Sequence, residues 1–148
     1  MLRIQLICTG RLKERFFIEA CEEYAKRLGR YCMLERLELP ESGDPERDGE
    51  AVLKKLPSDA YVAALCVEGR SYSSEELAAL LRECANRGKS RVCFVIGGSD
   101  GLSPAVKSRA DEKISMSRMT FPHHLARVMV LEQIYRAFSI LEGGKYHK

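Results

Sequence analysis

Apolar and polar residues follow one another in blocks along this chain, and the blocks predict strands and helices in alternation. Five mostly apolar runs end at glycine, proline or polar residues, which is typical of buried strands followed by turns. Runs without strict polar alternation favour strands covered on both faces. The predicted strands are residues 2–8, a segment through Leu34, Leu37 and Leu39, and residues 61–67, 92–96 and 113–116.

Between these runs, apolar residues recur at helical spacing. Ser73 and Glu76 form a capping-box pattern, and Ser103 with Pro104 is a typical helix start. Residues 41–49 are rich in Ser, Gly, Asp and Pro, and we expect a loop there. The predicted helices are residues 16–28, a short one through Val52 and Leu56, one from Ser73 to about Asn86, a short one from Pro104, and a long one over 123–141.

Strands that alternate with helices predict an α/β fold with a parallel sheet covered by helices on both faces. The length of 148 residues suits one domain, residues 1–148, with a single core. In such sheets ligands bind beyond the carboxyl ends of the strands. Gly97 to Gly101 directly follows a predicted strand and therefore lies at that edge.

Composition narrows the class without naming a function. Hydrophobic residues at 45% and charged residues at 30% are ordinary for a soluble protein, and a net charge of +3 does not identify a nucleic-acid binder. No apolar stretch approaches the roughly 20 residues that cross a bilayer. The six cysteines show no Cys-x-x-Cys pair, so we expect reduced thiols, no metal and a cytoplasmic location.

Three segments are candidates for chemistry, and their residue types leave each open. Residues 97–101 form either a ligand loop or a tight turn, and they match neither G-x-G-x-x-G nor the phosphate-binding P-loop. Residues 116–124 either line a pocket or plug the core, and the pair His123 and His124 lacks a zinc-binding pattern. The long helix over 123–141 is apolar around much of its circumference, which fits a core helix or a second subunit.

Taken in order, several blocks of the chain resemble the ribosomal RNA large subunit methyltransferase H family, the pseudouridine N3-methyltransferases of the SPOUT superfamily. The resemblance covers essentially the whole chain, and residues 41–50 form a loop shorter than is usual in that family. The blocks are residues 7–13 (ICTGRLK), 23–24 (EY), 26–28 (KRL), 94–102 (FVIGGSDGL), 120–123 (TFPH), 127–128 (RV), 132–138 (EQIYRAF) and 146–148 (YHK).

The resemblance implies a SPOUT-type parallel-sheet methyltransferase fold with a trefoil knot in the C-terminal half. It also implies that S-adenosylmethionine binds within the knot and that no metal is needed. Glycine and apolar side chains suit this cofactor, because they let the backbone approach the adenine within an apolar slot. The cofactor-binding residues implied are Leu65, Gly97, Met116, Ser117, Arg118, Met119, Thr120 and Phe121.

The same resemblance implies methylation of N3 of a pseudouridine in 23S ribosomal RNA, on assembled ribosomes at the subunit interface. Tyr146 and His147 match the family's substrate-side residues, and we expect them and Arg127 to be catalytic. A homodimer would let one subunit's tail complete its partner's site. We expect phosphate contacts from Arg127, Arg136, Lys145 and Lys148, and a bracing role for His123.

Two other functions remain as alternatives. One is a noncatalytic ribosome-binding or assembly factor that retained the fold, against which the intact candidate segments argue. The other is a doubly wound nucleotide-binding enzyme, for which the phosphate-binding glycine pattern is missing.

Overall fold

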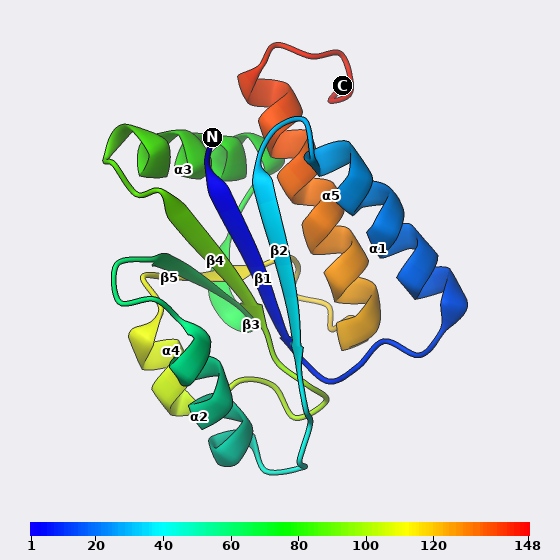
Figure 1. Cartoon of the computed structure of the whole chain (residues 1–148), viewed down its shortest axis with the longest axis vertical. Helices are drawn as coiled ribbons and strands as arrows, with labels where there is room; N and C mark the ends of the chain where they lie inside the picture. Colours follow the sequence, from blue (N-terminus) through cyan, green and yellow to red (C-terminus); the bar gives the residue numbers. More distant parts are fainter.

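A computed structural model describes residues 1–148, and its centre is a five-stranded parallel sheet in the order β2-β1-β4-β3-β5 (Figure 1). Each neighbouring pair of strands runs in the same direction. This confirms the α/β class and the parallel sheet predicted from the sequence. The strands are β1 (Arg3–Thr9), β2 (Met33–Leu39), β3 (Tyr61–Ser71), β4 (Arg91–Ile96) and β5 (Glu112–Ser115).

The apolar runs of the sequence correspond to the inner strands. In β1 and β4 every residue after the first is buried, because helices cover both faces of these strands. Strand β2 lies at an edge of the sheet, so no strand pairs with its outer side. Its charged residues stand between Leu34, Leu37 and Leu39. Charged side chains on an edge strand oppose pairing with another chain.

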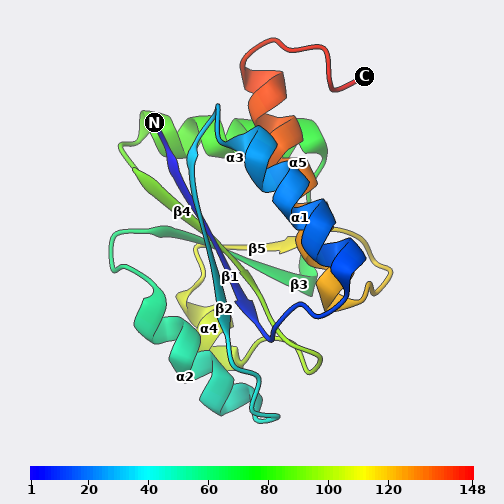
Figure 2. The ribbon, with the colours of Figure 1, turned by 45° about the vertical axis from the view of Figure 1, so that its right-hand side comes forward.

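Helices form the two outer layers of the molecule, and they lie on opposite sides of the sheet (Figure 2). The larger core cluster joins the sheet to α1, α3 and α5, and the smaller one joins it to α2 and α4. The helices are α1 (Arg15–Leu28), α2 (Pro45–Lys55), α3 (Ser74–Asn86), α4 (Pro104–Arg109) and α5 (His123–Leu141).

Helix α2 begins earlier than predicted, within the segment that we expected to be a loop. Asp44 caps the helix by accepting the Glu46 N–H at 3.1 Å, and Pro45 occupies the first turn. The polar residues that signal a loop are also the residues that start a helix, so composition alone placed the boundary wrongly. The capping box of Ser73 and Glu76 is present as predicted.

The strands β3 and β5 also differ from the prediction at their ends. Strand β3 continues to Ser71, past the predicted end at Val67, and its pairing with β5 shifts register between Leu65 and Arg70. Gly69 lies in this irregular stretch, where an added Cβ would stand 2.7 Å from the backbone of Lys113. Strand β5 covers residues 112–115, one residue earlier than predicted.

Helix α5 lies over the sheet between α1 and α3, and none of its residues is fully exposed (Figure 1). This position explains the wide apolar circumference read from the sequence, because three neighbours contact the helix. No helix of the molecule is both long and apolar enough to cross a bilayer. The trefoil knot implied by the resemblance stays a prediction.

Candidate functional site

A cleft of about 650 Å³ lies beyond the carboxyl ends of β4 and β5 and beside the irregular part of β3. Its walls come from residues 65–68, the glycine loop 97–102, and the connector 114–123 that leads into α5. Seven of the eight predicted cofactor residues line this cleft, and Arg118 is the exception. Those seven are Leu65, Gly97, Met116, Ser117, Met119, Thr120 and Phe121.

The glycine loop is too tight to accept side chains at its start. A Cβ on Gly97 would stand 2.6 Å from the carbonyl carbon of Gly101, which is shorter than real contacts allow. Gly101 has a φ of +79°, a conformation that favours glycine. The two ends of the turn are joined by the Gly101 N–H, which donates to the Gly98 carbonyl at 3.0 Å. Backbone atoms of this loop therefore form one wall of the cleft.

The connector after β5 is folded by its own serine hydroxyls. The Ser115 hydroxyl donates to the Ser117 carbonyl at 2.9 Å, and the Ser117 hydroxyl accepts the Met119 N–H at 3.0 Å. Met116 is half-buried, whereas the Met119 side chain is 74% exposed. The connector is thus ordered by local hydrogen bonds and presents apolar side chains toward the cleft.

Helix α5 begins directly after the connector, and no side chain caps its first turn. His123, its first residue, lines the cleft, and its Nδ1 atom is buried without a hydrogen-bond partner. Burial lowers the pKa of His123, and the nearby His124 lowers it further, so the ring is neutral near pH 7. The neighbouring His124 lies near Glu14, with its Nδ1 3.4 Å from the carboxylate.

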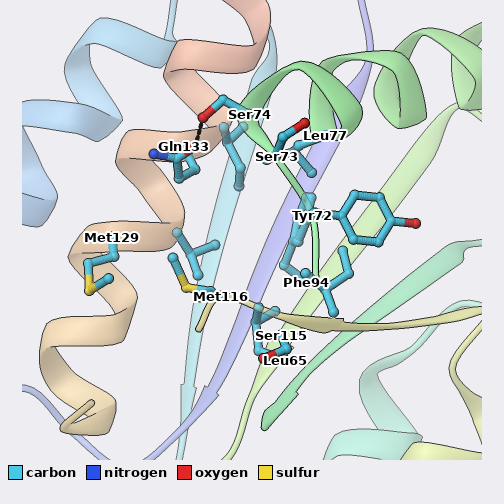
Figure 3. A pocket seen from close by; sticks show the side chains of 13 residues that line it. Leu65, Tyr72, Ser73, Ser74, Leu77, Phe94, Ser115, Met116, Met129 and Gln133 are labelled. Atoms are coloured by element: carbon cyan, nitrogen blue, oxygen red, sulfur yellow. Dashed lines mark hydrogen bonds between the residues drawn. The ribbon is translucent and has the colours of Figure 1, made fainter. Parts of the chain in front are cut away.

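A second, smaller cavity of about 330 Å³ adjoins the cleft between β5, α3 and α5 (Figure 3). Most of its lining is apolar, and the polar part includes Ser74 and Gln133, joined by a hydrogen bond of 2.7 Å. The two cavities are neighbours, because four residues line both of them. The shared residues are Leu65, Ile114, Ser115 and Met116.

Arg127, in the second turn of α5, is buried at 2% exposure. Its guanidinium donates to Glu38 at 2.7 Å and to the carbonyls of Thr9 and Gly10 at 3.3 and 2.6 Å. These contacts join α5 to the ends of β1 and β2. Arg127 is absent from the lining of both cavities described above, and its guanidinium lies near Gly10, which His123 of the cleft also approaches.

The C-terminal tail folds back onto α5 and the start of α3 of its own chain. The Tyr146 hydroxyl donates to Glu132 at 2.6 Å, and this hydrogen bond raises the pKa of Tyr146. His147 lies between Arg136, 3.1 Å from its Nδ1, and Glu75, 3.0 Å from its Nε2. Because a guanidinium can only donate, Nδ1 accepts and Nε2 bears the proton that faces Glu75.

The tail and the cleft lie at different levels of α5. Ala126 lines the cleft and Arg136 contacts His147, and the ten helical steps from one to the other correspond to about 15 Å. Within one chain, the structure therefore does not bring Tyr146 and His147 to the predicted cofactor residues. Arg136 is also paired with Glu132, at 2.6 Å, rather than free for phosphate.

Sequence reasoning missed three carboxylates near the candidate residues: Glu41, Glu75 and Glu132. Glu132 precedes Arg136 by four residues, a spacing that signals an ion pair on a helix. Glu41 and Glu75 reach partners that are distant in the sequence, and no local pattern marks them. No group of three or more His, Cys, Asp or Glu side chains is placed to hold a metal ion.

Comparison with known proteins decides the family. A family model described as predicted SPOUT methyltransferase matches residues 2–147. The chain belongs to the SPOUT methyltransferase family. Among curated relatives of this SPOUT methyltransferase is the ribosomal RNA large subunit methyltransferase H of Bacillus pumilus strain SAFR-032, 46% identical over 159 aligned positions that cover 99% of this chain and 100% of that protein. The protein of the same name from Listeria monocytogenes serotype 4a strain HCC23 is 45% identical with the same coverage.

Solved structures agree on the fold of this SPOUT methyltransferase. A probable methyltransferase from Bordetella pertussis Tohama I aligns with a TM-score of 0.59 and 13% identity, covering 93% of this chain and 96% of its own. A probable methylase family protein from Haemophilus influenzae Rd KW20 aligns with a TM-score of 0.58 and 18% identity, covering 99% of this chain and 70% of its own. At these identities the likeness concerns the fold alone.

SPOUT methyltransferases use S-adenosylmethionine, and the residues of the cleft fit this cofactor. At Gly97 the cleft is bordered by backbone atoms, because no side chain fits there. Met116 and Phe121 supply apolar surface, and the buried His123 Nδ1 has no hydrogen-bond partner in the protein. A mostly apolar cleft with a few polar atoms is typical of small-molecule sites.

Proposed function

We propose that this protein is an S-adenosylmethionine-dependent methyltransferase that methylates N3 of a pseudouridine in 23S ribosomal RNA of the large subunit. The observation that carries the proposal is the full-length identity of 46% to a protein named ribosomal RNA large subunit methyltransferase H. The cleft supports it, because seven of the eight residues expected to bind the cofactor line one cavity. We also propose action on assembled ribosomes, in the cytoplasm, and a trefoil knot around the cofactor.

The cleft residues would hold the cofactor as follows. The backbone of Gly97 and Gly98 offers hydrogen-bonding groups without intruding side chains, and Leu65, Met116 and Phe121 enclose an apolar slot. Bound S-adenosylmethionine supplies a methyl group on a sulfonium, which is already an activated leaving group. The protein's remaining tasks are to fix the reacting geometry and to help the imide nitrogen lose its proton.

Tyr146 and His147 would perform the substrate-side work. Neutral His147 has one basic ring nitrogen, and in the described fold Arg136 occupies it. The imidazole must therefore leave Arg136 before it can accept a proton from the nucleobase. The Tyr146 hydroxyl donates to Glu132 in the described fold, and it would have to leave that carboxylate before it could donate to a carbonyl of the base.

A two-fold homodimer would bring the tail to a cleft. Within one chain, the contacts of Tyr146 and His147 lie along α5 from the cleft. The tail of a partner subunit is not tied to α5 of the subunit whose cleft it would enter. In a two-fold dimer, each contact that one subunit makes with its partner is also made in the reverse direction. We therefore propose that each tail completes the site of the other subunit.

The buried guanidinium of Arg127 favours a positioning role over contact with RNA. It fixes the β1 turn and α5 relative to each other through Thr9, Gly10 and Glu38. Phosphate binding would then rely on exposed cations, for which Lys145, Lys148 and the exposed Arg118 beside the cleft are candidates.

The experiment that tests the function is transfer of labelled methyl from S-adenosylmethionine to ribosomes that lack the modification, with mass spectrometry of the digested 23S RNA. We expect one methyl on N3 of a pseudouridine. Purified large subunits and naked RNA serve as parallel substrates, and label on intact ribosomes alone would support a site made at the subunit interface. Binding to cofactor and ribosomes without transfer would favour the noncatalytic assembly factor instead.

A further inference from the structure

Glu41 reaches from the loop after β2 to the glycine loop after β4. Its Oε2 atom accepts the Ser99 N–H at 2.8 Å and the Ser99 hydroxyl at 2.9 Å. These two hydrogen bonds lower the pKa of Glu41, so the carboxylate is charged at neutral pH. Hydrogen bonds to a charged acceptor are stronger than neutral ones, which makes this contact a defined link between two loops.

The backbone around the carboxylate is shaped to admit it. A Cβ on Gly98 would stand 2.3 Å from Oε2, so a side chain at this position would displace the Glu41 carboxylate from its contact. On its other side, Oε1 would lie 3.2 Å from a Cβ on Gly10. The carboxylate thus fits between the turn after β1 and the glycine loop, two segments joined to central strands of the sheet.

The loop that presents Glu41 is itself anchored. The Ser42 N–H donates to the Asp48 carboxylate at 3.1 Å and its hydroxyl does so at 2.6 Å, and Asp48 belongs to α2. The glycine loop has less support, because Glu41 is the only side chain that hydrogen-bonds to residues 97–101. Glu41 is therefore held by its own loop, and through Ser99 it supports the glycine loop that forms one wall of the cleft.

We propose that Glu41 is a positioning residue that fixes the glycine loop in the conformation that receives the cofactor. The ligand named here rests on the proposed function, whereas the effect of Glu41 on the loop does not. The alignment with the Bacillus pumilus protein spans 159 positions against 148 residues here, and we expect the shortened stretch to lie at residues 41–50, which follow β2.

The test compares Glu41→Ala and Glu41→Gln with the wild type by isothermal titration of S-adenosylmethionine. We expect Glu41→Ala to raise the dissociation constant about three- to tenfold, since two hydrogen bonds to an exposed carboxylate are lost. Glu41→Gln keeps one acceptor oxygen and should recover part of the affinity. At saturating cofactor the loss of turnover in both variants should be smaller than the loss of affinity, because the bound cofactor then helps to hold the loop.

Two further variants make the test specific. Glu46→Ala removes an exposed carboxylate from the first turn of α2 and should leave cofactor affinity unchanged. Ser99→Ala should weaken affinity modestly in the wild type and have little further effect in the Glu41→Ala background, which is the signature of a coupled pair. Wild-type affinity in Glu41→Ala, or additive losses in the double variant, would overturn the proposal.

A readout on the cofactor-free protein separates this inference from the proposed function. Amide hydrogen exchange of Ser99 should be slow in the wild type and in Glu46→Ala, and markedly faster in Glu41→Ala. If the wild type binds no S-adenosylmethionine, the proposed function fails, and the Ser99 exchange rates alone decide whether Glu41 holds the loop. Equal exchange in wild type and Glu41→Ala would contradict the inference even where cofactor binds.

Discussion

At the residue scale, the cleft depends on positions where a side chain is excluded or buried. Gly97 is the clearest case, since its surroundings are backbone atoms of Gly101 and Leu102 that cannot rotate away. The sequence indicated this glycine because it follows a predicted strand and belongs to one of the resembling blocks. Only the folded loop shows that a Cβ at this position would meet the backbone of Gly101.

Gly97→Val should abolish cofactor binding, because the new Cβ would displace the backbone of Gly101. Overpacking of this kind costs roughly 3 kcal/mol, which corresponds to about a hundredfold in affinity. Isothermal titration measures the effect. Gly29→Ala is the control, since Gly29 ends α1 in a right-handed conformation and lies outside both cavities. Wild-type affinity in Gly97→Val would remove this loop from the cofactor site.

Arg127→Met should lower the free energy of unfolding by roughly 2–3 kcal/mol, because hydrogen bonds to a buried guanidinium are lost and Glu38, still partly exposed, keeps some solvation. Urea denaturation measures this change, and turnover measured well below the midpoint separates stability from chemistry. Unchanged stability with a large loss of turnover would contradict the positioning role and return Arg127 to the catalytic residues.

At the element scale, α5 connects the parts of the site. Its first turn borders the cleft, Arg127 in its second turn contacts the ends of β1 and β2, and its later turns receive the tail. The helix was predictable over its full length, because apolar residues recur along it at helical spacing, and the strands were predictable apart from the ends of β3 and β5. The start of α2 was not, since Asp44 and Pro45 serve loops and helix starts alike.

Deleting residues 146–148 should abolish methyl transfer and leave cofactor affinity unchanged. The tail contacts Glu132, Tyr135 and Glu75, none of which lines the cofactor cleft. A methyl-transfer assay compares the turnover of the truncated protein with that of the wild type, and isothermal titration compares their affinities for the cofactor. Circular dichroism verifies that the truncated protein is folded. Unchanged turnover in the truncated protein would exclude Tyr146 and His147 from the mechanism.

At the scale of the whole molecule, the question is whether the tail works in its own subunit or in the partner. Mixing the Gly97→Val protein with the protein lacking residues 146–148 distinguishes the two. If tails act across a dimer, each mixed dimer regains one intact site, and subunit exchange should restore about a quarter of wild-type activity. If tails act within one chain, every site stays incomplete and no activity returns. Sedimentation of the mixture verifies that dimers form.

The sequence by itself determined the fold class and the positions of most elements, since the runs and spacings of apolar residues are a local property that the chain carries wherever it folds. It also indicated the three segments of the cleft, through glycines after a strand and through an ordered set of resembling blocks. Only the tertiary structure decided that Arg127 is buried, that Glu41 holds Ser99, and that the tail lies along α5 from the cleft. The physical reason is that each of these contacts joins side chains on elements that the strand order brings together, and no local pattern encodes that order.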